Sequence, residues 1–429
     1  MKITALLISL VHLSRCSYAM SGWLCIGVFS LVTQSWAGDY SDHEEIEQLI
    51  TAVASQGVSR EWARRILDSA NRQKSILKAI SRPAEKTKPW YEYRKIFLTS
   101  ERIEAGVEFW REHASVLNHT AERMSVPAET IVAIIGVETF YGRITGNYRV
   151  LDALATLAFD YPRRANFFRK ELEHFLLLSW ESEKDPLALK GSYAGAMGYG
   201  QFMPSSYRAY AQSFDNGSSA DIWENPADAI MSVANYLRMH GWKMGEPVVI
   251  PVRFSGHDLS VFDVNMRPSQ SVGSLSGQGF ALANRVSEEE LVTPIRLEGE
   301  NGFEHWFGLQ NFYVITRYNH SAMYALAVWQ LSDAIAQKSL NLAKEKTPGL
   351  ALSRRYKYIQ LGAFQSLVTA QKFSEDLKVE WFYPVNVSPF DTDQGRLYRV
   401  RMGPFENIAL LTKVLAQLSE SGLAVQPIP

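Results

Sequence analysis

An apolar helix that ends on a carboxylate is the feature that most constrains the fold of this chain. Residues 131–137 are apolar at nearly every position, so the helix that they predict has no face to turn to water. Such a helix belongs in the core of a domain. Glu138 follows in its last turn, and Gly142 is the expected end of the helix. A glycine-rich loop comes later, at residues 195–204, and its backbone can approach a ligand closely.

The position of Glu138 predicts an acid. The partial negative charge at the C-terminal end of a helix disfavours a carboxylate, and burial disfavours it too. Both effects raise the expected pKa of Glu138 and favour the protonated group, which is what a glycosidase needs for its leaving group. The alternative is a glutamate that turns outward to solvent, as most glutamates do. The apolar context and the glycine loop favour the acid.

Several long motifs occur in the order found in a known family. They lie at residues 136–139, 151–157, 161–164, 190–207, 232–236 and 315–321. Together they resemble the membrane-bound lytic transglycosylase B family over residues 44–336, and several motifs in order are more specific than any one of them. The resemblance implies a mainly α protein, whose catalytic region is a lysozyme-like α+β fold with a small β-containing insertion. It also implies an enzyme, a lytic murein transglycosylase that cleaves the glycan strands of bacterial peptidoglycan.

The resemblance further implies a mechanism with a single catalytic residue. Ordinary glycoside hydrolysis uses two carboxylates, and no second acid stands out, since Asp152 and Asp160 have no obvious water-activating role. Glu138 would protonate the β-1,4 bridging oxygen between N-acetylmuramic acid and N-acetylglucosamine. It would then act as base on the C6 hydroxyl of the muramoyl sugar, which attacks C1 and forms a 1,6-anhydromuramic acid end.

Two alternatives to this function remain open. A hydrolytic muramidase would let water attack C1 and would leave a reducing end. A catalytically inactive glycan-binding protein would bind strands without cutting them, although the intact motif around Glu138 argues against it.

The family's cleft residues are carried over by position. Asn319 or Ser192 would orient the substrate's acetamide group or Glu138. Tyrosines and Gln201 would hydrogen-bond sugar hydroxyls, and Met203 would pack against a sugar ring. The predicted substrate-binding residues of the catalytic region are Arg163, Arg164, Ser192, Gln201, Met203, Tyr236, Tyr318, Asn319 and Tyr324.

Some of these residues have a structural alternative. Arg163 and Arg164 would meet lactyl or peptide carboxylates, because guanidinium groups bind carboxylates bidentately. Their alternative is an ion pair with Asp160 or Glu171. The alternative for Tyr236 is packing in the core, and the glycine loop could be only a tight turn.

A calcium loop known in some family members is degenerate in this chain. Ser213 and Gly217 stand where acidic ligands are expected, which leaves Asp215, Asp221 and Asp228 as weak candidates. We therefore expect weak calcium binding or no metal, and no other cofactor.

Residues 1–37 predict a signal peptide. Basic residues precede an apolar stretch at residues 23–32, and residues 35–37 fit a small-x-small cleavage site. The apolar stretch is too short for a comfortable transmembrane helix. We expect export to the periplasm, with membrane association only if the leader is retained. Both cysteines, Cys16 and Cys25, lie in the leader, so thiol catalysis and disulfides are not expected in the mature chain.

The rest of the chain divides into three regions. The resemblance places the catalytic region at residues 38–337, with a lysozyme-like core at about 126–245 and 310–337. Within it, residues 248–252 predict a strand, and the Ser/Gly-rich residues 269–279 predict a loop or an insertion. The polar residues 338–355 predict a linker.

Residues 356–429 predict a separate small α+β domain. Strand-like motifs at residues 356–364 and 397–405 are each followed by a helical segment. They resemble the SPOR domain, a sporulation-related repeat that binds peptidoglycan glycan lacking stem peptides, which implies a βαβ-type, ferredoxin-like fold. Gln360 is the candidate glycan contact. Trp381 is a weaker one, for which support of the sheet is the favoured interpretation.

The expected partners are peptidoglycan glycan strands. The net charge of -1 gives no reason to expect nucleic acid. SPOR-like domains suggest cell-division or cell-wall synthesis proteins as further partners, by resemblance only.

Overall fold

The structure is a computed structural model that describes most of the chain after the leader. The described residues are 38–81, 88–215, 217, 219–282, 286–346, 357–380, 383–392, 395–405, 408–421, 423 and 425–428. The predicted signal peptide and Trp381 lie outside them. None of the helices within these ranges combines the length and the apolarity needed to cross a bilayer.

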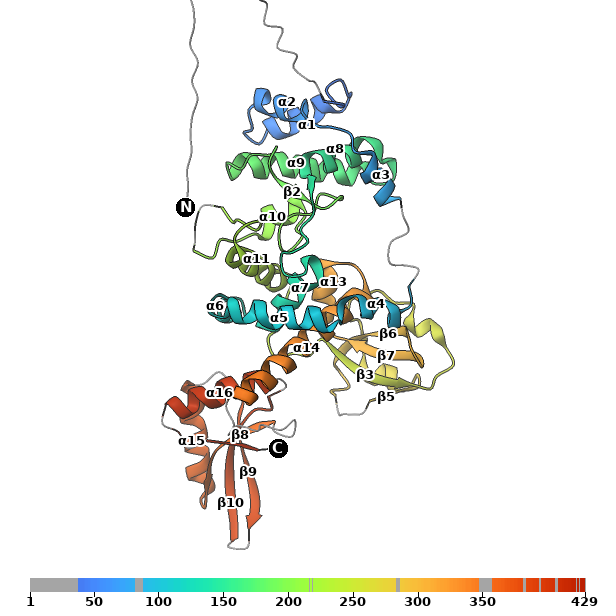
Figure 1. Ribbon diagram of the computed structural model, residues 1–429. Helices are drawn as coiled ribbons and strands as arrows, with labels where there is room; N and C mark the ends of the chain where they lie inside the picture. The colour runs from blue at the N-terminus through green and yellow to red at the C-terminus, as the bar shows by residue number, and fades with distance from the viewer. Residues whose placement is uncertain are drawn as a thin grey trace, which may run out of the picture. The chain divides into compact units, whose positions relative to one another are not determined.

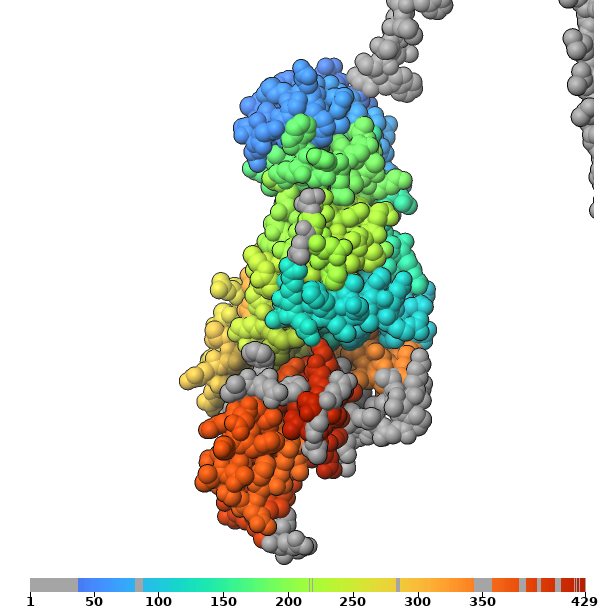
Figure 2. All heavy atoms as spheres, turned by 90° about the vertical axis from the view of Figure 1, so that its left-hand side faces the viewer, coloured from blue at the N-terminus to red at the C-terminus, as the bar shows by residue number. Residues whose placement is uncertain are grey.

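The first three helices pack on a helical pair that comes about 100 residues later in the chain. α1 (Ile46–Ala54) contacts α2 (Arg60–Leu67) and α9 (Ala165–Glu181), while α3 (Lys74–Ile80) contacts α8 (Val150–Asp160). Figures 1 and 2 show these blue helices lying on the green α8–α9 pair. The short helix η1 (Pro162–Arg164) joins α8 to α9, as the proline at residue 162 predicts.

The buried carboxylate of Asp152 in α8 connects this helix to the segment between α2 and α3. Its Oδ1 accepts hydrogen bonds from Asn71 N at 2.9 Å and from Arg149 Nη2 at 2.5 Å, and its Oδ2 accepts from Gln73 Nε2 at 3.3 Å. Asp152 is only 6% exposed. Asp152, for which the sequence indicated no catalytic role, therefore has a structural role.

The central helix is α7 (Ala128–Thr139), and the prediction of a core helix is confirmed. Residues 130–136 are all buried, and α7 packs against α5 (Ser100–Glu112), α6 (Ala114–Met124), α11 (Pro226–Met239) and α14 (Ala322–Lys346). The chain leaves the helix at Phe140, whose φ of 52° is left-handed, and not at Gly142. Phe140 N and Tyr141 N bind the carbonyls of Gly136 and Ile135, so the helix end is closed without a glycine.

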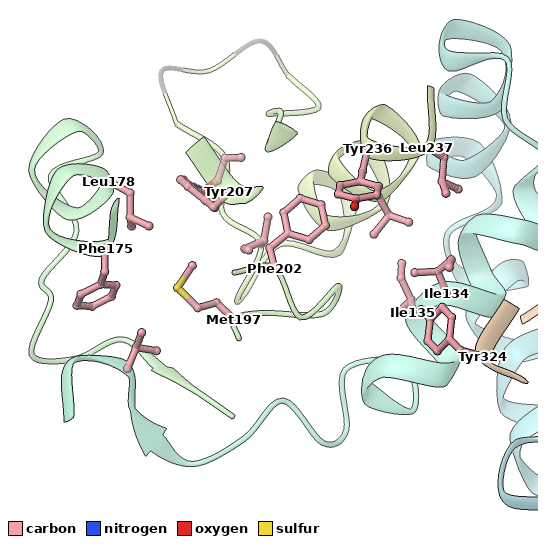
Figure 3. Close-up of a cluster of buried hydrophobic side chains, with 14 of the residues drawn as sticks. Ile134, Ile135, Phe175, Leu178, Met197, Phe202, Tyr207, Tyr236, Leu237 and Tyr324 are labelled. Atoms are coloured by element: carbon pink, nitrogen blue, oxygen red, sulfur yellow. Dashed lines mark hydrogen bonds between the residues drawn. The ribbon is translucent and has the colours of Figure 1, made fainter. Parts of the chain in front are cut away.

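Further helices complete the region around α7. α4 (Trp90–Phe97) precedes α5, α10 (Pro204–Tyr210) follows the glycine loop, and α13 (Gln310–Tyr318) precedes α14. Pro204 and Pro226 begin α10 and α11, as predicted. Figure 3 shows buried side chains of α9, the glycine loop, α11, α7 and α14 in one cluster, with Phe202 beside Tyr236 and Tyr324 beside Ile135.

The β-containing insertion is confirmed as a five-stranded antiparallel sheet with the order β4-β6-β7-β3-β5. It has its own core around Phe280 and Phe307. The strands are β3 (Val249–Phe254), β4 (Gln270–Ser271), β5 (Phe280–Leu282), β6 (Leu291–Gly299) and β7 (Gly302–Gly308), and η2 (Leu259–Phe262) follows β3.

The prediction of a loop at residues 269–279 is wrong in part. This segment contains β4 and a short helix, α12 (Val272–Ser276). Ser271 caps that helix, because its Oγ accepts a hydrogen bond from Ser274 N at 3.2 Å. Serines that indicate a loop by composition act here at a helix start.

The C-terminal domain has the expected ferredoxin-like arrangement. Its antiparallel sheet has the order β11-β8-β10-β9 and is covered by α15 and α16. The strand β9 was not predicted, because Pro389 lies within it, and proline is tolerated on an edge strand. The elements are β8 (Tyr358–Phe364), α15 (Leu367–Glu380), β9 (Val385–Thr392), β10 (Gly395–Met402), α16 (Ile408–Glu420) and β11 (Gln426–Ile428).

The predicted linker at residues 338–355 is helical in its first half. α14 continues to Lys346, and residues 347–355 lie outside the described ones. Polarity indicated a linker, but Lys, Glu, Ala and Leu all favour helix, and Lys338 Nζ binds Glu104 Oε1 of α5 at 2.6 Å. Helix propensity, rather than polarity, decides the structure here.

We expect Asp152→Ala to destabilise the protein by about 3 kcal/mol, because it removes the carboxylate that pairs with the guanidinium of Arg149 and leaves that charge with only the Ser69 carbonyl. Glu47→Ala is the control, since Glu47 is exposed and its pairs with Arg60 and Arg64 should each contribute less than about 1 kcal/mol. Urea unfolding followed by circular dichroism measures both. Equal unfolding midpoints for the two variants would contradict the role given to Asp152.

Candidate active site

Glu138 and Tyr324 form the centre of the candidate site. The Tyr324 hydroxyl donates a hydrogen bond to Glu138 Oε1 at 2.6 Å. Tyr324 is 2% exposed and lies in the first turn of α14, where Ser321 Oγ accepts from Tyr324 N at 3.2 Å. Glu138 is partly buried in the last turn of α7. Two helices distant in sequence therefore meet through one short hydrogen bond.

The tyrosines around Glu138 are neutral donors. Burial, and next the charge of Glu138, raises the pKa of Tyr318 and of Tyr324 well above the usual value of 10.0. Both hydroxyls therefore keep their protons at any pH at which an enzyme of this kind works.

The glycine loop is held in position by short backbone pairings. β1 (Tyr148–Arg149) follows the turn after α7 and pairs antiparallel with β2 (Lys190–Gly191), which leads into the loop. Within the loop, Met197 and Phe202 exchange two backbone hydrogen bonds of 2.9 Å. These pairings fix the loop relative to the end of α7.

The loop's own geometry accounts for its glycines. Gly198 has a φ of +68°, and a Cβ there would lie 2.3 Å from the Ile222 carbonyl oxygen. A Cβ on Gly200 would lie 2.8 Å from the Tyr318 hydroxyl oxygen. The close approaches within the protein thus account for the glycines at these positions, and a ligand-facing role of the loop stays a prediction.

Ser192 and Gln201 are partly committed to the loop itself. Ser192 Oγ accepts hydrogen bonds from Ala196 N at 3.0 Å and Ala194 N at 3.3 Å, which leaves its proton for another acceptor. Gln201 Nε2 donates to the carbonyls of Thr145 at 3.1 Å and Gly198 at 3.0 Å. Its Oε1 has no recorded donor among the described residues and is the atom that can accept from a ligand.

Tyr236 and Tyr318 bind the protein with their hydroxyls. The Tyr236 hydroxyl donates to the Arg317 carbonyl at 2.5 Å, and its ring stacks on His240 with the centroids 4.0 Å apart. Tyr236 is 7% exposed and lies beside Phe202 (Figure 3), which is the core packing weighed as its alternative. The Tyr318 hydroxyl donates to the Gly200 carbonyl at 2.5 Å.

The remaining predicted contacts lie at the surface or next to the loop. Asn319 is exposed directly after α13, and Met203 is the residue before α10. Arg163 and Arg164 are exposed in η1, where the Arg164 guanidinium lies 4.2 Å from the centroid of the Phe167 ring.

The two carboxylates proposed as alternative partners for these arginines, Asp160 and Glu171, bind other residues. Asp160 pairs with Arg72 at 3.0 Å, and Glu171 accepts hydrogen bonds from Ser205 N and Oγ at 2.9 and 2.7 Å. Both carboxylates therefore serve the scaffold. For Arg163 and Arg164, a role in binding substrate carboxylates remains a prediction.

Two residues of the site region were missed from the sequence. Arg102 of α5 donates from Nη1 to the Gly136 carbonyl at the end of α7, and its guanidinium lies 4.6 Å from the centroid of the Phe140 ring. Thr139 follows Glu138 and bonds to the Tyr199 carbonyl of the glycine loop at 2.9 Å. Its place in the motif at 136–139 was a signal for Thr139, whereas no local signal places Arg102 there.

The degenerate calcium loop is closed by its own backbone. Both oxygens of Asp228 accept from main-chain amides, those of Phe214 at 2.8 Å and Asp221 at 2.7 Å. Asp221 Oδ1 accepts from Trp223 N and Glu224 N, both at 3.1 Å. In the ranges described above, no three His, Cys, Asp or Glu residues come together as a metal site. These donors do not fit a tight calcium site.

A second candidate surface lies on the C-terminal domain. Gln360 sits on β8 opposite Arg401 of β10, on the face of the sheet that Ile359 and Leu361 do not occupy. The Arg401 guanidinium lies 4.4 Å from the Tyr358 ring, and the Arg399 guanidinium lies 4.1 Å from the Phe390 ring. The two arginines were not predicted, because the register that brings them to the face of Gln360 depends on the pairing of β8 with β10.

Comparison with known proteins gives two family matches. The family described as transglycosylase SLT domain matches residues 41–333, and the SPOR domain matches residues 353–428. The chain is 42% identical over 309 residues to the membrane-bound lytic murein transglycosylase B of Escherichia coli strain K12, covering 70% of this chain and 84% of that protein.

Solved structures agree with the sequence matches. The soluble lytic transglycosylase SltB1 of Pseudomonas aeruginosa is 51% identical, with a TM-score of 0.64 over 68% of this chain and 99% of that one. SltB3 of the same organism, in complex with NAG-NAM-pentapeptide, is 31% identical, with a TM-score of 0.60 over 68% of this chain and 80% of that one.

We expect millimolar calcium to change the melting temperature by less than about 1 °C, because a ligand present below its dissociation constant adds almost no stability. Differential scanning fluorimetry of protein treated with chelator, then supplied with calcium or magnesium, measures the effect. A rise of several degrees with calcium and not with magnesium would contradict the assignment of a degenerate loop.

We expect Tyr324→Phe to lower turnover roughly 30-fold, because a hydrogen bond to a charged group contributes about 2 kcal/mol. Loss of this donor destabilises the carboxylate of Glu138, so the alkaline limb of the pH–activity profile should move to higher pH. Tyr91→Phe on α4 is the control and should leave both readouts unchanged. An unmoved alkaline limb in Tyr324→Phe would show that the bond does not tune Glu138.

Proposed function

The chain belongs to the transglycosylase SLT-domain family and is a lytic transglycosylase of peptidoglycan, and from this premise we propose which residues carry the reaction. Glu138 is the single acid and base. The observation that supports it is the position of Glu138 at the end of the buried helix α7, beside the neutral donor Tyr324 at 2.6 Å. Asp152 and Asp160, the other acids considered, are engaged in scaffold contacts.

In the first step the carboxylic acid of Glu138 donates its proton to the glycosidic oxygen. The bond between that oxygen and C1 of N-acetylmuramic acid breaks, and the N-acetylglucosamine side leaves with a free hydroxyl. Positive charge develops at C1, and the neighbouring acetamide oxygen shares it. Asn319 or Ser192 orients this acetamide group; the free proton of Ser192 Oγ suits the role.

In the second step the carboxylate of Glu138 takes the proton of the C6 hydroxyl of the same muramoyl sugar. O6 forms a bond to C1, and Glu138 is again a carboxylic acid. No water is consumed, so a second carboxylate that positions water is not required. The nucleophile belongs to the substrate. Intramolecular attack provides an effective concentration of about 10⁵ to 10⁸ M.

The substrate contacts follow from atoms that remain available. Gln201 Oε1 accepts from a sugar hydroxyl, the exposed amide of Asn319 meets the substrate, and Met203 packs on a ring. Arg163 and Arg164 meet lactyl or peptide carboxylates. The related SltB3 structure with NAG-NAM-pentapeptide supports a glycan substrate that carries peptide. The reaction needs no cofactor.

The C-terminal domain binds the glycan strand and retains the enzyme on the cell wall. The SPOR match supports this role, and Gln360, Arg399 and Arg401 offer hydrogen bonds and cations on one face of its sheet. The enzyme works in the periplasm after removal of residues 1–37, or on the membrane if that leader is retained. Cell-division or cell-wall synthesis proteins are its further proposed partners.

We expect Glu138→Gln to lose turnover by about 10²-fold or more, because amide nitrogen cannot replace the acid and base, and to keep its affinity for glycan. Glu108→Gln, on the exposed side of α5, is the matched control. Release of soluble muropeptides measures turnover, and co-sedimentation with insoluble peptidoglycan measures binding. Turnover equal to that of the control would show that another residue is the acid.

A further inference from the structure

Two successive carbonyls of the glycine loop are each held by a hydroxyl from a different helix. Thr139 Oγ1 of α7 bonds to the Tyr199 carbonyl at 2.9 Å, and the Tyr318 hydroxyl of α13 donates to the Gly200 carbonyl at 2.5 Å. We refer to the oxygens of Tyr199 and Gly200 as the loop carbonyls. The glycine loop is therefore attached at two adjacent points.

Thr139 is connected on both sides. Gly142 N donates to Thr139 Oγ1 at 2.9 Å, so the same hydroxyl joins the turn after α7 to the glycine loop. Thr139 is 1% exposed, which keeps water from replacing these bonds. A Cβ on Gly142 would lie 2.1 Å from Tyr199 Cε1, so the turn and the loop also touch through the Tyr199 ring.

Thr139 is bonded covalently to the proposed acid. A shift of Thr139 relative to the loop moves Glu138 by a similar amount, while Tyr324 holds the Glu138 carboxylate from the other side at 2.6 Å. The buried hydroxyl of Thr139 is therefore the direct hydrogen-bond link between the segment that carries Glu138 and the glycine loop.

We propose that Thr139 is a positioning residue that selects the sugar's own C6 hydroxyl over water as the nucleophile. This inference rests on the proposed function. Once the bond between C1 and the leaving oxygen has broken, either O6 or a water oxygen forms the new bond to C1, and in both cases Glu138 takes the proton. A tight spacing between Glu138 and the loop favours O6, because O6 is already in the site, and it leaves less room for water.

A purely structural role is the alternative explanation. Threonine in the last turn of a helix often bonds to the carbonyl four residues earlier, and Thr139 Oγ1 lies 3.2 Å from the Ile135 carbonyl. In that case the loss of the hydroxyl would lower stability or total turnover. It would not alter which nucleophile attacks, so the ratio of products separates the two explanations.

The test compares Thr139→Val, which keeps the shape and removes the hydroxyl, with Thr139→Ser, which restores it. Thr120→Val is the control, because Thr120 is 0% exposed on α6 and its Oγ1 has no hydrogen-bond partner among the described residues. Each full-length variant digests purified peptidoglycan, and mass spectrometry counts the anhydro and hydrated muramoyl ends.

We expect Thr139→Val to reduce turnover between about 10-fold and 100-fold and to raise the ratio of hydrated to anhydro ends about tenfold or more. Thr139→Ser should return the ratio to that of wild type, and Thr120→Val should not move it. If Thr139→Val does not fold, Tyr318→Phe releases the second loop carbonyl and should change the ratio in the same direction.

An unchanged ratio in the folded variant overturns the inference and leaves the proposed function intact. Hydrated ends alone from the wild-type enzyme would overturn the proposed function itself. The Thr139→Val sample therefore tests the inference, and the wild-type sample of the same experiment tests the proposed function.

Discussion

The burial of α7 on every side is the constraint on which the rest of the catalytic region depends. A helix without a polar face requires neighbours all around it, and α5, α6, α11 and α14 supply them. The chain can become polar only where this helix ends. Glu138 lies at that end, so its side chain is carried by a buried helix and is itself only partly buried.

Polar atoms at the end of α7 are satisfied by groups from distant parts of the chain. Arg102 binds the Gly136 carbonyl, Thr139 and Tyr318 bind the glycine loop, and Tyr324 binds Glu138. Buried hydroxyls and carbonyls must be paired or cost free energy, so these bonds stabilise the fold and fix the site at once. Tyr318 and Tyr324, which were predicted to bind substrate, thus also hold the protein around Glu138 in place.

Local sequence patterns predicted most of the fold. The apolar run of α7, the prolines at the starts of α10 and α11, and the strand motifs of the C-terminal domain were predicted from the sequence and confirmed. The features that were not predicted depend on tertiary context. The edge strand β9 contains Pro389, α14 continues through polar residues, and Arg102 reaches the site only because α5 packs on α7. The motifs around Glu138 drew attention to Tyr318 and Tyr324, but not to their partners.

The central claim is that one carboxylate at the end of a buried helix cleaves the strand without using water. Mass spectrometry of the soluble products from purified peptidoglycan and the mature enzyme tests it most directly. The account predicts muropeptides that are lighter by one water than their hydrated counterparts and that resist borohydride reduction. Hydrated ends that borohydride reduces would contradict it, because they form only when water, rather than the C6 hydroxyl of the sugar, attacks C1.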